Sequence, residues 1–233
     1  MRRPVEVATL DRDLRLSDLR LPLVLDELSA GSGPWEVELG FGKGRYLLAR
    51  AAAAPERRFL GVEVASEYFQ LLRRRVRRRG LANVVAMRGA ALFLLAAVLP
   101  TSFASAVHVY FPDPWPKSRH QKRRLFDPQS VDLVVGLLAP GGSLCFATDH
   151  LAYGEEVARL LAAYPGLRLT RRDDPWPEGP RTHYEAKYLA GGHPIVRLEA
   201  ERTAAAPALH PEGERAILVG ARASRAADAS LES

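Results

Sequence analysis

Residues 35–54 read WEVELGFGKGRYLLARAAAA and combine a strand, a glycine-rich turn and a helix. The first five residues have the apolar and β-branched character of a strand, and residues 45–54 carry helix formers. Gly40, Gly42 and Gly44 join the two elements, because glycine adopts positive φ freely and lets a ligand approach the backbone. The N-terminus of the helix presents unpaired N–H groups to such a ligand. This stretch therefore predicts a nucleotide-type binding turn in an α/β protein.

Strand and helix patterns alternate along the rest of the chain as far as residue 164. The further strands are expected at residues 59–64, 83–87, 105–111 and 143–148, and the helices between them at 66–79, 90–99, 127–138 and 153–164. Such alternation predicts a mainly parallel sheet with helices on both faces. Residues 167–171 and 194–201 add two strands, joined by a long loop over 172–193. The fold class is therefore α/β, with a doubly wound, mainly parallel, seven-stranded sheet.

The size and charge of the chain limit its domain organisation and its partners. A length of 233 residues suits one α/β domain with a full core. Residues 1–33 are expected to form a flexible N-terminal arm, 34–202 the folded domain, and 203–233 a loosely attached tail. The net charge of +6, from 33 Lys and Arg against 27 Asp and Glu, favours an anionic partner without proving one.

Several classes of site are disfavoured by composition. The single Cys145 has no partner for a disulfide or a structural zinc site, which fits a reducing cytoplasm. No apolar segment of the signal-peptide type follows the first residues, and no run has the length of a membrane span. The histidines show no ligand spacing, so no metal site is predicted. The choice between monomer and homodimer is left open by the sequence.

A second informative stretch is VHVYFPDPWPKSRHQKRR, residues 107–124. After a strand, three alternating prolines fix their own φ and restrict the residues before them, so a stiff, extended loop should carry Asp113 and Trp115. A run of five cations follows, at Lys117, Arg119, Lys122, Arg123 and Arg124. An aimed carboxylate beside this run suggests a polyanionic substrate. A rigid surface turn before a solvated helix also explains the pattern.

Two acidic residues accompany the glycine turn. Glu38 precedes Gly40 by two residues, and Glu63 ends the second strand, where an acid can accept hydrogen bonds from ribose hydroxyls. The spacing departs from the dinucleotide pattern, since position 45 is arginine, and the chain lacks the residues of a phosphate loop. Two acids around the turn suit a cationic nucleoside such as S-adenosylmethionine better than a pyrophosphate. An ordinary turn with solvent-facing acids is the alternative.

Taken together, the glycine turn and the proline loop resemble the tRNA (guanine-N7)-methyltransferase family. The matching stretches are VELGFGKGRYLL (37–48), FLGVEV (59–64), NVVAMRGAA (83–91), YFPDPWPKSRHQKRR (110–124), FATDH with Tyr153 (146–153) and THYEAKYLAGGHPI (182–195). The block FPDPWPKxRHxKRR is the most specific of these. One position departs from the family pattern, because Gly89 stands where the family usually has aspartate.

The resemblance implies a class I, Rossmann-like methyltransferase fold over residues 34–202, with S-adenosylmethionine as methyl donor. It also implies methylation at N7 of a guanine in the tRNA variable loop, at position forty-six. The implied cofactor-binding residues are Glu38, Gly40, Gly42, Gly44, Glu63, Gly89 and Asp113, and Asp113 is also the catalytic residue. The implied substrate-binding residues are Lys117, Asp149, Thr182, His183, Tyr184 and Glu185. The implied RNA-binding residues are Arg119, His120, Gln121, Lys122, Arg123 and Arg124.

The chemistry agrees with these residue types. Guanine N7 carries a lone pair and no proton, so attack on a sulfonium methyl group needs no general base and depends on positioning. A carboxylate from Asp113, Asp149 or Glu185 can pair with the guanine edge, and the sequence does not decide which. Trp115 or Tyr184 can stack on an extruded base, although ordinary packing also explains both.

Two alternatives keep part of this interpretation. The first is a methyltransferase that acts on another nucleic-acid atom or on a small molecule. The second is an RNA-binding module without catalysis that retains a degenerate cofactor turn.

The six arginines within residues 73–79 are typical of a solvated helix face, with RNA contact as the alternative.

Overall fold

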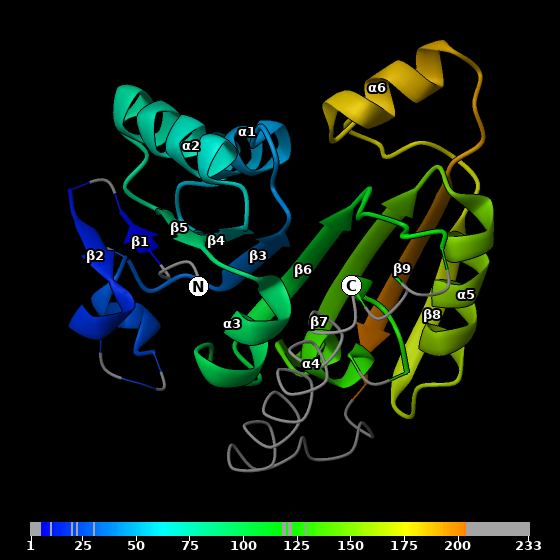
Figure 1. Ribbon diagram of the computed structural model, residues 1–233, viewed down its shortest axis with the longest axis horizontal. Coiled ribbons are helices and arrows are strands. Elements are labelled where there is room, and N and C mark those ends of the chain that lie inside the picture. The colour runs from blue at the N-terminus through cyan, green and yellow to red at the C-terminus, as the bar shows by residue number, and fades with distance from the viewer. Residues whose placement is uncertain are drawn as a thin grey trace, which may run out of the picture.

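A single twisted sheet organises the molecule (Figure 1). The computed structural model describes residues 6–9, 11–19, 21, 23–29, 31–117, 120, 123–128 and 130–203. Within these ranges the sheet has nine strands in the order β2-β1-β5-β4-β3-β6-β7-β9-β8. Their bounds are β1 Glu6–Ala8, β2 Asp13–Arg15, β3 Trp35–Leu39, β4 Arg58–Glu63, β5 Val84–Arg88, β6 Ala104–Tyr110, β7 Leu138–Thr148, β8 Leu167–Arg172 and β9 Val196–Arg202. The strands from β5 to β7 pair in parallel, whereas β9 runs antiparallel to both β7 and β8.

Helices cover both faces of the sheet. Their bounds are α1 Arg45–Ala53, α2 Ser66–Arg79, α3 Ala91–Ala97, α4 Val131–Val135, α5 Leu151–Ala162 and α6 His183–Ala190, with short 3-10 turns at Leu16–Asp18 and Leu25–Glu27. On one face, Leu47 of α1 and Leu72 of α2 pack in a cluster with Phe59 of β4. On the other face, α3, α4 and α5 contribute Leu94, Val134 and Tyr153 to the larger core. The predicted doubly wound architecture is confirmed.

The described residues of the N-terminal arm take part in the sheet and in the core. Its strand β1 pairs antiparallel with β5, and β2 pairs with β1, so the sheet has two strands more than the seven predicted. Leu23, Leu25 and Leu28 are each at most 5% exposed and belong to the main core. The described part of the arm is therefore held by apolar burial, because these leucines lose their contact with water only when they lie against the sheet.

Two local predictions differ from the structure. The helix expected over residues 127–138 is reduced to the five residues of α4, and β7 begins at Leu138, which pairs with Ala104 of β6. The expected loop over 172–193 contains a helix, α6. In both places tertiary pairing and capping decide the outcome over local propensity.

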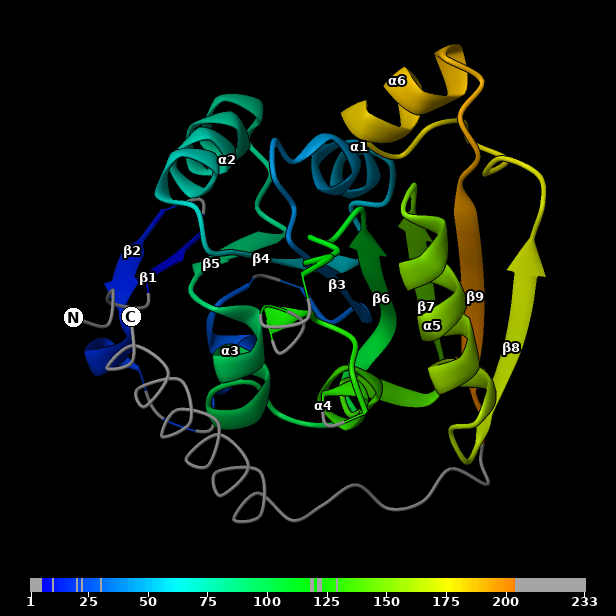
Figure 2. The same ribbon diagram turned by 45° about the vertical axis from the view of Figure 1, so that its right-hand side comes forward.

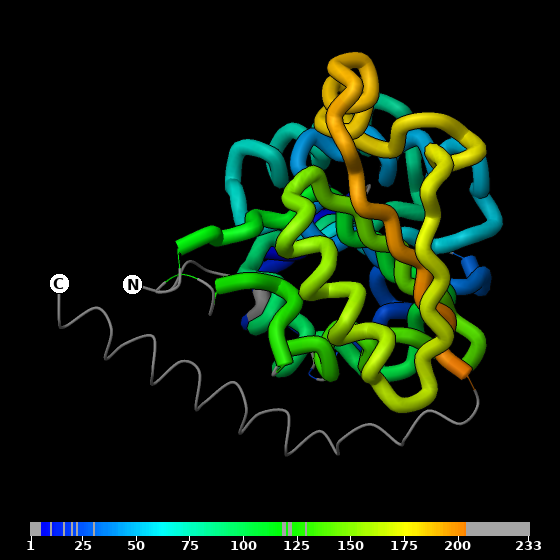
Figure 3. The backbone as a smooth tube through the Cα atoms, turned by 90° about the vertical axis from the view of Figure 1, so that its right-hand side faces the viewer, coloured from blue at the N-terminus to red at the C-terminus, as the bar shows by residue number. Residues whose placement is uncertain are grey.

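The carboxyl ends of the parallel strands meet at one edge of the sheet. The strand order reverses between β3 and β6, which is the position where α/β sheets bind ligands. Helix α6 lies beyond this edge, above the ends of β6 and β7 (Figures 1 and 2), and its segment stands at the top of the tube in Figure 3. In the part of the chain that the structure describes, no helix combines the length and apolar character needed to cross a membrane.

Candidate active site

The glycine turn between β3 and α1 forms an open cradle at the strand-order reversal. Gly40 has φ of +77° and Gly42 has φ of +51°, which lie in the left-handed region that side chains other than glycine adopt at a cost. A Cβ atom added at either glycine would meet nothing within 4 Å. The space above the turn is therefore free for a ligand that approaches the backbone.

Glu38, at the floor of this turn, is a buried carboxyl group with an unused oxygen. It is 3% exposed, the N–H of Leu47 donates to its carboxylate, and among the described residues its Oε2 atom has no hydrogen-bond partner. Burial raises the pKa of Glu38 to about 8, and the nearby Glu63 adds to the increase. A buried carboxyl group in this state is suited to a positively charged ligand group, which would stabilise its ionised form.

Glu63 fastens the turn to the end of β4. Its Oε2 accepts from the N–H of Gly42 at 2.9 Å, and its Oε1 accepts from the N–H groups of Val64 and Ala65 at 2.8 and 2.9 Å. The predicted contact with a ribose stays a prediction. The bonds with the backbone show that the same carboxylate also sets the shape of the cradle, which the sequence did not reveal.

Gly89 lies close to the core helix α3. Its N–H donates to the carbonyl oxygen of Glu63 at 3.0 Å. A Cβ atom at this position would lie 3.1 Å from Cδ1 and 3.2 Å from Cγ of Leu94, which is fully buried. An aspartate here would require Leu94 to move, so the departure from the family pattern is matched by the local packing. A contact of Gly89 with a cofactor stays a prediction.

The proline loop after β6 is strained on both sides of Asp113. Phe111 has φ of +51° and Trp115 has φ of +39°, and such a conformation costs a residue with a side chain about 1–3 kcal/mol. Trp115 packs against the ring of His120 and under the guanidinium group of Arg123. Asp113 is exposed between these fixed points. The surrounding contacts thus hold the loop in one shape, as the three prolines predict.

Helix α6 closes over this loop through aromatic contacts. The ring of Phe111 stacks on Tyr184 with centroids 6.3 Å apart and on Tyr188 at 5.8 Å, with interplanar angles of 29° and 25°. Directly after β7, the carboxylate of Asp149 lies beside the hydroxyl of Tyr188, and burial, followed by this carboxylate, raises the pKa of Tyr188. The structure therefore brings together the ends of β6 and β7 and the segment predicted to bind substrate.

The start of α6 is anchored by Thr182 and Glu185. Thr182 is the N-cap, and its Oγ1 accepts from the N–H of Glu185 at 3.0 Å. Glu185 is fully buried, with one oxygen bound by Nε of Arg197 and the other by the N–H of Arg181, both at 2.8 Å. This geometry gives Glu185 an anchoring role, whereas His183 and Tyr184 point outward and are exposed. The substrate contacts predicted for the four residues stay predictions.

Comparison with known proteins identifies the family. A family model described as a putative methyltransferase matches residues 32–198. The tRNA (guanine-N(7)-)-methyltransferase of Alkalilimnicola ehrlichii is 42% identical over 180 residues, which are 76% of this chain and 76% of the relative. The enzyme of the same name from Nitrosococcus oceani is 39% identical over 167 residues, 72% of this chain and 71% of the relative.

The chain belongs to the tRNA (guanine-N7)-methyltransferase family. The resemblance seen in the sequence is thereby confirmed. Among solved structures, the 16S rRNA methyltransferase KamB superposes with a TM-score of 0.61 at 14% identity, over 85% of this chain and 99% of that one. This likeness supports the class I methyltransferase fold of the family member described here.

One structural residue of this family member was missed by sequence reasoning. The guanidinium group of Arg181 lies 3.8 Å from the ring centroid of Trp176 and 5.1 Å from that of Tyr46. It donates to the hydroxyl of Tyr110, the last residue of β6, and to Oε1 of Glu178 at 2.6 Å. Arg181 thus ties the segment before α6 to the end of β6, directly before the proline loop. The sequence indicates this role only through Trp176 and Arg181, which stand among three prolines in residues 175–181.

The predicted RNA-binding run divides into different environments. Arg124 is buried, donates to the carbonyl oxygen of Pro114 at 2.7 Å, and forms an ion pair with Glu156 of α5 at 2.5 Å. It braces the proline loop in addition to any contact with RNA. Lys117 and Arg123 are exposed, and His120 is half-buried. The remaining members of the run, Arg119, Gln121 and Lys122, lie outside the described residues.

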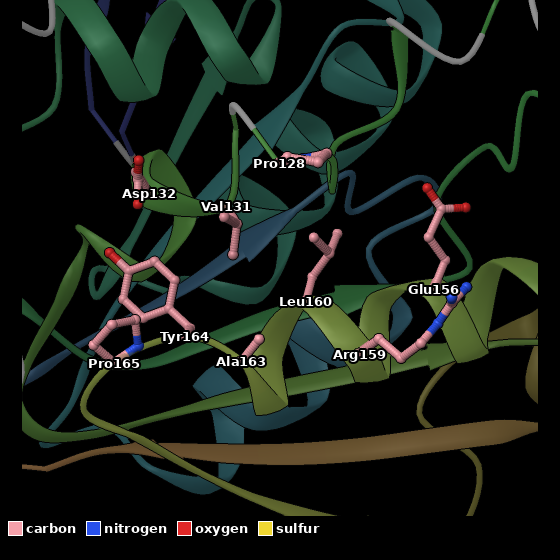
Figure 4. Close-up of a pocket in the computed structure, with 9 residues that line it drawn as sticks. All are labelled: Pro128, Val131, Asp132, Glu156, Arg159, Leu160, Ala163, Tyr164 and Pro165. Carbon is pink, nitrogen blue, oxygen red and sulfur yellow. The ribbon is translucent and has the colours of Figure 1, made fainter.

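An open groove between α4 and α5 lies apart from this site (Figure 4). None of the predicted site residues lines it. In this groove the hydroxyl of Tyr164 lies beside the carboxylate of Asp132, and burial is the main reason why the pKa of Tyr164 is raised. The groove is lined by Pro128, Val131, Asp132, Glu156, Arg159, Leu160, Ala163, Tyr164 and Pro165.

Within the described ranges no group of three His, Cys, Asp or Glu residues could hold a metal ion.

Proposed function

We propose that this chain transfers the methyl group of S-adenosylmethionine to N7 of a guanine in the variable loop of tRNA. The observation that carries the proposal is the pairing of two features at one sheet edge: the open glycine turn with its buried Glu38, and the rigid loop that presents Asp113. Relatives from two organisms, 39% and 42% identical to this chain, are named tRNA (guanine-N(7)-)-methyltransferase, which supports guanine N7 in tRNA as the target.

The residues around the glycine turn fit S-adenosylmethionine. The free space above Gly40 and Gly42 admits a ligand to the backbone, and the unused oxygen of Glu38 suits a cationic group. Glu63 and Gly89 border the same turn from the ends of β4 and β5. Glu38, Gly40, Gly42, Gly44, Glu63 and Gly89 would hold the donor, with Asp113 beside them. When bound, the donor supplies a methyl group on a positively charged sulfur.

The residues of β6, β7 and α6 would orient the guanine. Because N7 has a free lone pair, the protein must place this atom in line with the methyl carbon and sulfur, and no proton has to be removed. Methyl transfer moves positive charge onto the purine, which a nearby carboxylate stabilises. Asp113 and Asp149 are the candidates for this role. Asp149 lies beside Tyr188 of α6.

The exposed side chains beside this site fit an RNA substrate. Tyr184 is 60% exposed and backed by Phe111, which makes it a platform for a base that leaves its stack. Lys117 and Arg123 would face phosphates, together with Arg119, His120, Gln121 and Lys122 of the same run. We propose a cytoplasmic site of action, where tRNA is the available substrate.

The test is incubation of the purified chain with unmodified tRNA and S-adenosylmethionine labelled on the methyl group, followed by nucleoside analysis. The expected product is labelled 7-methylguanosine in tRNA. Label in another nucleoside would favour a methyltransferase with a different target atom. Binding of tRNA without any binding of S-adenosylmethionine in calorimetry would favour a non-catalytic RNA-binding module.

A further inference from the structure

The glycine turn carries a group of cations on its outer side. Lys43 lies between two glycines with left-handed backbone, and Arg45 is the first residue of α1. Both side chains are exposed, whereas Gly44 between them and Tyr46 after them are buried. The geometry that opens the turn toward a ligand therefore also turns these two charges toward solvent.

A third cation reaches the same place from α2. Arg75 donates from its guanidinium group to the carbonyl oxygen of Lys43 at 2.7 Å. A carbonyl is uncharged, so this bond positions Arg75 without neutralising it. In the part of the chain that the structure describes, no carboxylate forms an ion pair with Lys43, Arg45 or Arg75.

Two arginines on the other flank of α2 show the contrast. Arg73 and Arg77 both pair with Asp13 of the N-terminal arm, at 2.8 and 3.0 Å. The same helix thus uses two of its cations to hold the arm and turns Arg75 toward the glycine turn.

Helix α6 places the predicted substrate-binding segment close to the three cations Lys43, Arg45 and Arg75. His183, the first residue of α6, is exposed, and the pKa of His183 is lowered by partial burial and then by Arg45, Lys43 and Arg75. Figures 1 and 2 show α6 and α1 side by side at the carboxyl edge of the sheet. The cations therefore border the site from the α1 and α2 face, whereas Arg124 and its loop lie against α5 on the opposite face.

We propose that Lys43, Arg45 and Arg75 form a second RNA-contacting surface, which binds phosphates of the tRNA on the α1 side of the methylation site. The inference rests on the proposed function, because it gives the substrate of that site a second line of contact. Cations that form no ion pair among the described residues are available to neutralise the phosphates of a nucleic-acid backbone.

The test compares two double variants with equal loss of charge. Lys43→Gln with Arg45→Gln removes two cations of this surface, and Arg159→Gln with Arg168→Gln removes two exposed arginines of α5 and β8. Binding of tRNA is measured over a series of salt concentrations. The first double variant should bind on the order of tenfold more weakly and lower the salt slope by about one to two, and the control should keep both near the wild-type values.

Calorimetry separates this surface from the cofactor turn. The Lys43 and Arg45 double variant should bind S-adenosylmethionine with wild-type affinity, and its methylation rate at saturating tRNA should be unchanged. A salt slope equal to that of the wild type, or an equal drop in the control variant, would overturn the inference. A wild-type chain that binds tRNA but methylates no guanine would refute the proposed function, while the salt slopes would still decide on this surface.

Discussion

The two halves of the sheet's carboxyl edge use acidic side chains in opposite ways. At the ends of β3 and β4, Glu38 and Glu63 are buried, and Glu63 is bonded to a backbone N–H of the glycine turn. After the end of β6, Asp113 is exposed on a loop held by aromatic rings, and Asp149, which follows β7, lies beside Tyr188 of α6. The first half has the fixed shape needed for one small ligand. The second half has the exposed charge and stacking surfaces needed for a macromolecule.

The largest effect is expected from the anchor that holds α6 in the second half. In Arg197→Met, the carboxylate of Glu185 loses the arginine of its ion pair. Both side chains are at most 3% exposed, so the carboxylate is left buried without a counter-charge. The free energy of unfolding, measured with urea, should fall by about 3–5 kcal/mol. Arg172→Met, which breaks the half-exposed pair with Glu199, serves as control and should cost at most about 1 kcal/mol. Equal losses in the two variants would remove the special role of the anchor.

Replacement of the exposed acid of the second half should affect the methyl-transfer step more than donor binding. Asp113→Ala removes the charge that would stabilise the methylated purine, so the single-turnover rate of methyl transfer should fall about a hundredfold to a thousandfold. The affinity for S-adenosylmethionine should stay measurable by calorimetry. Asp113→Asn keeps the size and removes the charge, and should be impaired as well. Turnover near that of the wild type would refute the role of Asp113.

The exposed aromatic platform should contribute to RNA binding and not to donor binding. Tyr184→Ala removes the ring that stacks on Phe111, and base stacking is worth about 1–3 kcal/mol. The affinity for tRNA should therefore fall about fivefold to a hundredfold, as measured by fluorescence anisotropy. Tyr184→Phe keeps the ring and should behave as the wild type does. If Tyr184→Ala binds tRNA with unchanged affinity, the second half of the edge does not hold the base by stacking.

The buried acid of the first half should couple donor binding to pH. Burial raises the pKa of Glu38 from 4.5 to about 8, so the free protein holds a proton at neutral pH that a bound cation would displace. Affinity for S-adenosylmethionine should increase as pH rises toward 8, and calorimetry in buffers of different ionisation enthalpy should detect the released proton. Glu38→Gln should bind about tenfold more weakly, a loss of about 1.4 kcal/mol, and release no proton.

The raised pKa of Glu38 also makes the stability of the free protein depend on pH, in the opposite direction to donor affinity. The folded pKa of Glu38 lies above the usual 4.5, so the native state holds more protons than the unfolded chain between these values. Without ligand, the contribution of Glu38 to the free energy of unfolding is therefore present at low pH and is lost as pH rises through about 8. Urea unfolding of Glu38→Gln should lack this part of the pH dependence, and an identical profile in both proteins would contradict the burial argument.

Sequence patterns were sufficient where local and tertiary preferences agree. The alternation of strands and helices predicted the parallel core. The glycine turn was placed correctly because its three glycines adopt the positive φ angles that the turn requires. The proline loop was equally readable, since each proline restricts its neighbours. In these places the backbone has few alternatives, so the residues alone decide the structure.

Prediction was incomplete where distant residues decide the structure. Strands β1 and β2 have three residues each, too few for a periodic signal, and the arm is ordered by the burial of Leu23, Leu25 and Leu28. Helix α6 depends on the cap of Thr182 and the pairing of Glu185 with Arg197, which is twelve residues away. In the same way Arg124, predicted from its position among cations, is buried through contacts with α5.

The position of β9 has a consequence for how the protein is made. This strand is the last one along the described chain, yet it lies between β7 and β8 in the sheet. During synthesis the edge of β7 stays unpaired until residues 196–202 have left the ribosome, and β8 has no neighbour before then. Pairing between strands far apart in sequence is slow, and open edges promote aggregation. A nascent chain stopped before residue 196 should therefore depend on chaperones to stay in solution.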